Sequence, residues 1–307
     1  MVKKPQGSGQ AGMHKRRPTH LCRSWLFLNG AEAQTLKGAV ESGSDVLIQE
    51  FEDFTPPALR PDARGLATEI YAEWRTSNVV VAARINPLES DDGMADLTSI
   101  MAGDPDIVAL PKVEDPAQVV TLARELDRLE RELGRVAQST EILPNIELAR
   151  GVMQTFAIAR ASPRVRACLL ASEDLAADLG AERGRDGIEL AYCRQRFLME
   201  CVAARVMAVD YPYTWRDNEG VEAETRMARR LGFKAKSAVV TEHAAIINST
   251  LTPTQDEVDN ARRIVTTFEA AQAGGDARVD LDGSMIEVPI YTNAKRLLQR
   301  AKDLAER

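Results

Sequence analysis

The chain has 307 residues, of which 44% are hydrophobic and 28% are charged, and its formal net charge is -7. This composition is typical of one large globular domain with an extension and is too hydrophobic for a disordered chain. The acidic balance disfavours a nucleic-acid partner, and because no apolar run reaches membrane-spanning length we expect a cytoplasmic protein with no membrane partner.

The chain begins with a basic, Gly-rich stretch that has no apolar periodicity, so we predict that residues 1–20 form a disordered tail. The cysteines have no CxxC spacing and stand in apolar or helical stretches. We therefore expect buried, reduced thiols rather than a disulfide or a zinc site. These cysteines are Cys22, Cys168, Cys193 and Cys201.

From Arg23 onward, short apolar runs alternate with longer amphipathic stretches. The runs are continuous, as are the strands of a parallel sheet that is covered on both faces. Eight runs are predicted as strands, at 24–30, 45–53, 79–86, 106–113, 141–147, 165–174, 204–213 and 233–241. The predicted helices between them include 31–42, 61–76, 115–134, 186–203 and 219–231.

Eight strand–helix units in roughly 220 residues have the size of a TIM barrel, so we predict a (β/α)8 barrel over residues 21–250. A doubly wound open sheet is the competitor, but the glycine-rich nucleotide motifs GxGxxG and GxxxxGK[ST] are both absent. Residues 251–307 form a C-terminal helical extension with a predicted helix at 254–273 and a last helix near the end. This extension is expected to be a buttress, a lid or an oligomer arm.

Polar side chains gather where the predicted strands end, and the active sites of TIM barrels lie at that end. Each alone is typical of a helix cap or a solvated turn. As a set, the carboxylates would repel one another unless a cation joined them. The set consists of Asn29, Glu50, Glu52, Asp53, Arg84, Asn86, Lys112, Asn145, Glu147, Glu173 and Asp174.

The chemistry of these side chains favours a hard cation. Histidine occurs only three times, which disfavours a zinc or iron site. Glu147 and Asp174 offer the carboxylate oxygens that suit Mg²⁺, and Arg84 offers a planar fork for a substrate carboxylate. The set predicts a site that binds a 2-oxo or 2-hydroxy acid.

Lys112 is an alternative centre of reactivity, because a lysine in an apolar pocket can form a Schiff base with a carbonyl substrate. Its neighbours Pro111 and Glu114 give no sign of such a pocket. A salt bridge is the favoured interpretation of this lysine.

Eight segments match the motifs of one known family, in order, over about 23–300. RSWLFLNG (23–30) resembles RSxLFxPG, EFEDFTPP (50–57) resembles DLEDAV, and RIN (84–86) resembles RVN. LPKVEDP (110–116) is similar to PKVE, IELARG (146–151) to IETARG, and SEDLAADLG (172–180) to GxEDLAADLG. LGFKAKSAVV (231–240) and DGSMIEVP (282–289) resemble LGFxGKxxIHP and DGxMIDxP. The chain thus resembles the HpcH/HpaI aldolase and citrate lyase β-subunit family.

The resemblance implies a homotrimeric or hexameric TIM-barrel lyase. Such an enzyme cleaves or forms a carbon–carbon bond in a 3-hydroxy-dicarboxylate or its CoA thioester, of the citryl-, citramalyl- or malyl-CoA type. It implies that Glu147 and Asp174 hold Mg²⁺ and that Arg84 binds the substrate carboxylate and stabilises an enolate. Arg23 is expected at the mouth, and Glu287, a catalytic residue, is expected to reach a neighbouring subunit's site.

The chain departs from the family motifs at several positions. Glu50, predicted to contact substrate, and Glu287 each replace an aspartate, and VVTEH (239–243) stands where IHPxQ is expected. Two alternatives stay open. One is a retro-aldolase of 4-hydroxy-2-oxo acids, although no histidine ends a predicted strand. The other is a non-catalytic homologue that binds a metabolite or serves as a scaffold.

Overall fold

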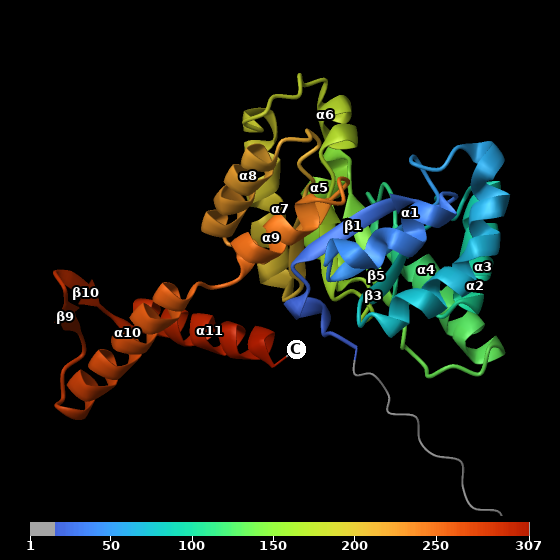
Figure 1. The fold of residues 1–307 in the computed structure, drawn as a ribbon. Coiled ribbons are helices and arrows are strands. Elements are labelled where there is room, and N and C mark those ends of the chain that lie inside the picture. The colour runs from blue at the N-terminus through green and yellow to red at the C-terminus, as the bar shows by residue number, and fades with distance from the viewer. Residues whose placement is uncertain (1–15, 307) are drawn as a thin grey trace, which may run out of the picture.

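The computed structural model describes residues 16–306, and its main body is a closed barrel of parallel strands (Figure 1). Neighbouring strands pair in chain order, and β1 also pairs with β8, which closes the barrel. The prediction of a (β/α)8 barrel is therefore confirmed. The strands are β1 (Ser24–Asn29), β2 (Val46–Glu50), β3 (Val80–Arg84), β4 (Ile107–Leu110), β5 (Glu141–Ile146), β6 (Ala167–Leu170), β7 (Met207–Asp210) and β8 (Ala235–Ala238).

Helices follow the strands and cover the outside of the barrel (Figure 1). Every predicted helix overlaps an observed one, although 31–42 divides into an α-helix and a 3₁₀ turn, η2 (Ala39–Ser42). The barrel helices are α1 (Ala33–Gly38), α2 (Arg60–Thr76), α3 (Asp91–Ala102), α4 (Pro116–Glu132), α5 (Ala149–Arg160), α6 (Glu173–Leu179), α7 (Ala191–Ala204), α8 (Asn218–Leu231) and α9 (His243–Leu251). The other 3₁₀ turns are η1 (Thr19–Leu21), η3 (Pro57–Leu59) and η4 (Ile188–Leu190).

The side chains of each strand alternate between two apolar layers. Trp25, Ile48 and Leu169 belong to the cluster inside the barrel. Leu26 and Leu47 belong to the larger cluster between the strands and the helices. Because both faces are buried, both must be apolar, which explains why the strands could be recognised as continuous apolar runs.

Helix α4 shows how the sequence sets the outer layer. Its N-cap Asp115 forms a capping box with Gln118, and Pro116 occupies the first turn, where its missing N–H costs nothing. One set of apolar residues in this helix recurs every three or four positions, and its members are all buried. They are Val119, Leu122, Leu126 and Leu129.

The C-terminal extension consists of α10 (Gln255–Ala273), a hairpin of β9 (Val279–Leu281) and β10 (Ser284–Ile286), and α11 (Val288–Ala305). Helices α10 and α11 pack together beside the barrel, and the hairpin lies at the far end (Figure 1). Arg300 of α11 donates hydrogen bonds to the carbonyl oxygens of His20 and Lys234, both at 3.1 Å. Both residues precede strands, so the extension is attached at the N-terminal end of the barrel.

The N-terminal residues 1–15 of the predicted tail lie outside the described part of the chain. Residues 16–20 contact the barrel instead of forming a disordered tail: Arg16 pairs with Glu141 at 3.1 Å, and Arg17 pairs with Asp45 at 3.4 Å. The cysteines are all buried free thiols, as predicted. Over residues 16–306, no helix is both long and apolar enough to cross a membrane.

A buried ion pair joins α4 to the loop before β6. Glu130 accepts two hydrogen bonds from Arg164, at 2.8 and 2.7 Å, and two from the backbone N–H groups of Gln138 and Thr140, at 2.7 and 3.0 Å. Although burial acts in the opposite direction, these donors lower the pKa of Glu130 to about 2. The carboxylate therefore stabilises the folded chain while it is ionised.

We expect Glu130→Gln to lower the free energy of unfolding by about 3 kcal/mol at neutral pH, because the folded-state pKa lies well below the ordinary value of about 4.3. The stabilisation is present above the unfolded-state pKa and is lost as the pH falls towards about 2. The difference from the wild type in urea unfolding should therefore shrink in acid. Glu132→Gln, on the exposed side of α4, is the control, since its pair with Arg128 is exposed. Equal losses in both variants would contradict this account.

Candidate active site

The C-terminal ends of the barrel strands surround a cavity of about 150 Å³. Inner-face residues of β1, β3, β5, β6 and β8 line it, and the segments that follow β2, β6, β7 and β8 form its rim. Catalytic groups of TIM barrels come from this end of the strands. The lining residues are Phe27, Asp53, Phe54, Arg84, Asn145, Leu169, Ala171, Ser172, Glu173, Asp174, Pro212, Thr214, Ser237 and Val239.

Arg84 ends β3 and is the central cation of the site. Its Nε lies 2.9 Å from Glu50 Oε1, and its Nη1 lies 3.3 Å from Glu52 Oε2 and 3.7 Å from Glu147 Oε1. Burial opposes its charge, but the three carboxylates raise the pKa of Arg84. This guanidinium therefore stays charged and fixed in the cavity wall.

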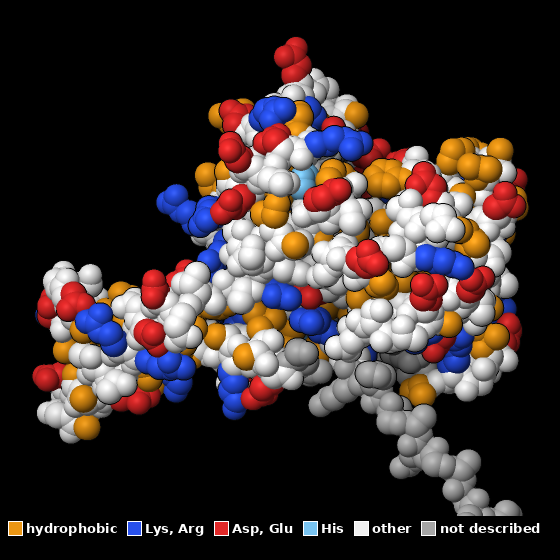
Figure 2. Space-filling model, viewed as in Figure 1, with side chains coloured by type: hydrophobic (Ala, Val, Ile, Leu, Met, Phe, Trp, Pro, Cys, Tyr) orange, Lys and Arg blue, Asp and Glu red, His pale blue; other side chains and the backbone are white. Residues whose placement is uncertain are grey.

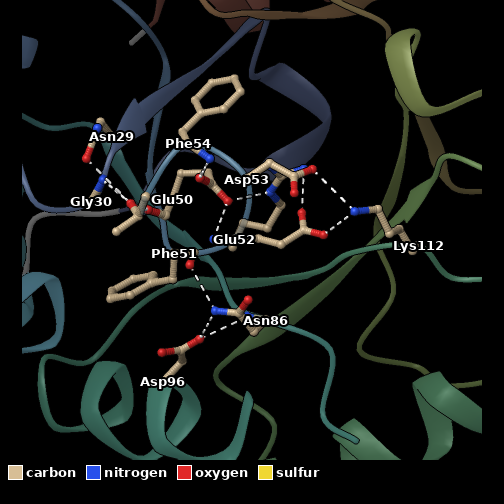
Figure 3. A network of polar contacts seen from close by, with 12 residues as sticks. Asn29, Gly30, Glu50, Phe51, Glu52, Asp53, Phe54, Asn86, Asp96 and Lys112 are labelled. Atoms are coloured by element: carbon tan, nitrogen blue, oxygen red, sulfur yellow. Dashed lines mark hydrogen bonds and ion pairs between the residues drawn. The ribbon is translucent and has the colours of Figure 1, made fainter. Parts of the chain in front are cut away.

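Glu50 ends β2 directly beside Arg84 and is fully buried. Besides Arg84, it accepts hydrogen bonds from the backbone N–H groups of Glu52 and Phe54, both at 2.6 Å (Figure 3). Both of its oxygens are thus occupied within the protein, and Glu50 does not line the cavity. The predicted substrate contact of Glu50 is therefore not supported, because its carboxylate instead holds Arg84 and the loop after β2.

Gly30 allows the end of β1 to pack closely against the end of β2. A Cβ atom at residue 30 would lie 2.3 Å from the backbone oxygen of Glu50. The Gly30 N–H donates to Thr55 Oγ1 at 2.9 Å, which ties the end of β1 to the loop after β2 (Figure 3). Only glycine allows this approach, and the loop that carries Glu52 and Asp53 depends on it.

Glu147 directly follows β5 and is fully buried. Its Oε1 lies 3.4 Å from the backbone nitrogen of Lys112, and no donor within residues 16–306 contacts its Oε2. Burial is the largest cause that raises the pKa of Glu147 to about 7; Arg84 lowers it, and Glu52 and Asp174 raise it. Burying a carboxylate with an unpaired oxygen is unfavourable unless a cation binds that oxygen. Glu147 is therefore suited to bind a cation.

Lys112 bridges the acidic side chains at the rim. Its Nζ lies 2.6 Å from Glu52, 3.3 Å from Asp53 and 3.7 Å from Asp174, and the first two contacts are drawn in Figure 3. Partial burial alone would lower the pKa of Lys112, but the hydrogen bond and charge of Glu52 raise it. The favoured salt bridge is thus present. Glu52, which belongs to the polar set at the predicted strand ends but has no role assigned from the sequence, connects Arg84 to Lys112.

The described residues contain no cluster of three or more His, Cys, Asp or Glu side chains that could hold a metal by themselves. Mg²⁺ does not need one, since it binds through one or two carboxylates and fills its other positions with water and substrate oxygens. The free, buried Oε2 of Glu147 fits this requirement, as does the half-buried Asp174 at the start of α6. The carboxylate oxygens of Glu147 and Asp174 therefore suit a hard divalent cation.

Two of the predicted site residues lie away from the cavity. Arg23 precedes β1 and pairs with Asp45 at 2.9 Å, at the N-terminal end of the barrel. Its prediction as a residue of the mouth is wrong, because the chain enters the barrel there. Glu287 is exposed at the N-cap of α11, in the extension that is attached to that same end.

A protein-family model described as HpcH/HpaI aldolase/citrate lyase matches residues 23–241. The chain is 33% identical over 283 residues to the citrate lyase subunit beta of Haemophilus influenzae, covering 92% of this chain and 97% of that protein. It is 24% identical to the mitochondrial citramalyl-CoA lyase of Mus musculus, covering 100% and 92%. The crystal structure of protein CitE from Mycobacterium tuberculosis, in complex with magnesium, acetoacetate and coenzyme A, has a TM-score of 0.76 and 25% identity, covering 92% and 99%.

Proposed function

Because the chain belongs to the HpcH/HpaI aldolase/citrate lyase family, we propose that it is a magnesium-dependent carbon–carbon lyase. It would cleave or form a 3-hydroxy-dicarboxylate or its CoA thioester, of the citryl-, citramalyl- or malyl-CoA type. The observation that carries the proposal is the buried Glu147 carboxylate with one free oxygen, 3.7 Å from Arg84, which lines a cavity at the C-terminal end of the barrel.

Glu147 and Asp174 would hold the magnesium ion, as their carboxylate chemistry suggests. When bound, Mg²⁺ supplies positive charge that stabilises the negative charge developing on the substrate during bond cleavage. Its role in this chain is supported by the magnesium in the CitE structure. The neighbouring Lys112 would keep Asp174 and Glu52 in place through its ion pairs.

Arg84 would bind the substrate carboxylate and help to stabilise the enolate that cleavage leaves behind. It can do so without reorganising, since Glu50 fixes the Nε edge of the guanidinium and the Phe27 and Phe54 rings lie 5.2 and 5.8 Å from its Cζ atom. Groups that are already in position cost nothing to orient during the reaction.

Glu287 would act in the site of a neighbouring subunit. The Arg300 contacts hold α11 at the N-terminal end of the barrel, and Glu287 lies about 20 Å along the helix from this anchor. The mouth is at the opposite end, so a second copy would be required, as in the predicted trimer or hexamer. Exposed Met285, Val288 and Ile290 give the extension an apolar surface for a second copy, and hydrophobic side chains are visible on it in Figure 2. A cytoplasmic location stays a prediction.

The proposal is tested by measuring the products released with Mg²⁺ and after chelation. Acetyl-CoA release from acyl-CoA substrates, lost on chelation, would support the lyase. Pyruvate release from 4-hydroxy-2-oxo acids would indicate the retro-aldolase instead. His243, the histidine nearest to a strand end, is fully buried and does not line the cavity. Binding of oxaloacetate without turnover of any candidate would indicate the non-catalytic homologue.

Lys112 is expected not to form a Schiff base. A Schiff-base lysine needs a lowered pKa, whereas the hydrogen bond that Lys112 donates to Glu52 raises the pKa of Lys112. Borohydride added together with pyruvate should leave the activity unchanged and add no mass to the chain, as judged by mass spectrometry. A Schiff-base aldolase treated in parallel is the positive control. A pyruvate adduct on Lys112 would contradict the proposed mechanism.

A further inference from the structure

Asn145 is a buried amide whose hydrogen-bonding groups have no partner. Its side chain is fully buried and lines the cavity beside Arg84. Neither its Oδ1 nor its Nδ2 has a hydrogen-bond partner in the described chain, 16–306. Its backbone carbonyl, in contrast, accepts a hydrogen bond from Val113 at 3.0 Å.

The alternation of β5 places this amide where it is. Successive side chains of a strand point to opposite faces, so Asn145 shares the inner face with Leu143 and with Glu147 just after the strand. Leu143 belongs to the apolar interior of the barrel, and Glu147 belongs to the charged mouth. Asn145 therefore stands at the boundary between the packed interior and the reacting end of the cavity.

An unsatisfied amide at this boundary is costly for the fold. Each buried polar group without a partner costs about 1–3 kcal/mol, whereas a leucine of similar size would fill the same space at no such cost. Ser237, which lines the same cavity, shows the usual arrangement, since its hydroxyl donates to the carbonyl oxygen of Asp210 at 2.9 Å. The two free groups of Asn145 are explained if a ligand satisfies them.

We propose that Asn145 is a specificity-determining residue, an inference that rests on the proposed function. Its side-chain amide hydrogen-bonds the 3-hydroxy group of the substrate and the carbonyl group that replaces this hydroxyl after cleavage. A hydroxyl can donate to Oδ1 and accept from Nδ2, whereas a carbonyl only accepts. A neutral amide can contact both forms. An aspartate in its place would lack the donor and would add a further negative charge beside Glu147.

The size of the cavity limits which part of the substrate contacts Asn145. An apolar cavity of about 150 Å³ accommodates a molecule as small as benzene. The cavity beside Asn145 has about this volume, so it takes the hydroxy acid end of a substrate and leaves a nucleotide-bearing group outside. Asn145 therefore contributes to the recognition of the hydroxy acid and not to that of the nucleotide-bearing group.

The experiment compares Asn145→Leu and Asn145→Ala with the wild type. The thermal unfolding midpoint is measured without ligand, and the binding of oxaloacetate and of pyruvate is measured by calorimetry with Mg²⁺ present. We expect both variants to bind these acids about tenfold or more weakly, since a lost hydrogen bond leaves the ligand group unpaired. We also expect Asn145→Leu to unfold at the same or a higher temperature, which a purely structural role would not allow. Asn260→Leu, on the exposed surface of α10, is the control.

The outcomes separate this inference from the proposed function. If the wild type binds the acids and Asn145→Leu binds them equally well, this inference alone is overturned. A lower unfolding midpoint in both variants with unchanged binding also overturns it, because Asn145 would then serve the fold. If the wild type binds neither acid with Mg²⁺, both the inference and the proposed function are overturned.

Discussion

Glu147→Gln is expected to abolish magnesium-dependent turnover while leaving the fold intact. The amide keeps the shape of the side chain but removes the charge that would bind the metal ion. We expect kcat/KM to fall at least about a thousandfold, which corresponds to about 4 kcal/mol. Calorimetric titration with Mg²⁺ should show a parallel loss of metal binding.

The same variant should not lose stability. Because burial raises the pKa of Glu147 to about 7, the metal-free folded protein holds this proton more tightly than the unfolded chain does. Ionisation of Glu147 therefore costs stability as the pH rises from about 4 towards 7, and glutamine removes that cost. The unfolding midpoint of Glu147→Gln above neutral pH should equal or exceed that of the metal-free wild type.

Glu114→Gln is the matched control, since Glu114 is partly exposed and pairs with Arg150 outside the cavity. It should keep both turnover and metal binding. Turnover by Glu147→Gln that survives exhaustive chelation would show that the carbon–carbon bond is cleaved without the metal site. The proposed function would then fail at its central residue.

The barrel could be predicted from the sequence because its strands are apolar on both faces. The runs at 79–86 and 165–174 were recognised in this way, and they contain β3 (Val80–Arg84) and β6 (Ala167–Leu170). Both strands are shorter than their runs. The last residues of a run leave the barrel to form the mouth, and apolar periodicity does not register that change of direction.

The site could be predicted only in part. Arg84 and Glu147 could be selected as candidates because several charged side chains end successive strands, and such a set needs a cation or a substrate to balance it. Arg23 was misplaced by its motif, although its position before β1 already puts it at the other end of the barrel. The place of Asn145 in the site could have been predicted from strand alternation, since it lies two residues before Glu147 and therefore faces the same side.

The long-range contacts could not be predicted. Glu52 lies beyond the end of β2, where no alternation fixes its direction, so its contacts with Arg84 and Lys112 depend on how the loop folds. The attachment of α11 likewise depends on Arg300 meeting the backbone of His20. Helical periodicity predicts that α11 exists, but it does not predict which end of the barrel the helix contacts.

The second large effect is expected in mixed oligomers. We expect Glu287→Gln to lower kcat by about a hundredfold, as is typical for the loss of a group that transfers a proton. Glu147→Gln is inactive for a different reason. If Glu287 serves the site of a neighbouring copy, co-expression of the two variants should assemble some complete sites, each with one intact residue from either chain.

In a trimeric ring that contains both variants, about one site in three has an intact Glu147 on one subunit and an intact Glu287 on the next, so about a third of the wild-type activity should return. The measurement is the specific activity of oligomers purified through a different tag on each variant. Glu147→Gln mixed with Asp174→Asn is the control, because both residues belong to the same subunit's site and no complete site can form without a wild-type chain. An extension attached at the N-terminal end of its own barrel can reach a mouth only on another copy. A Glu287 mixture that is as inactive as this control would therefore show that Glu287 does not act in the site.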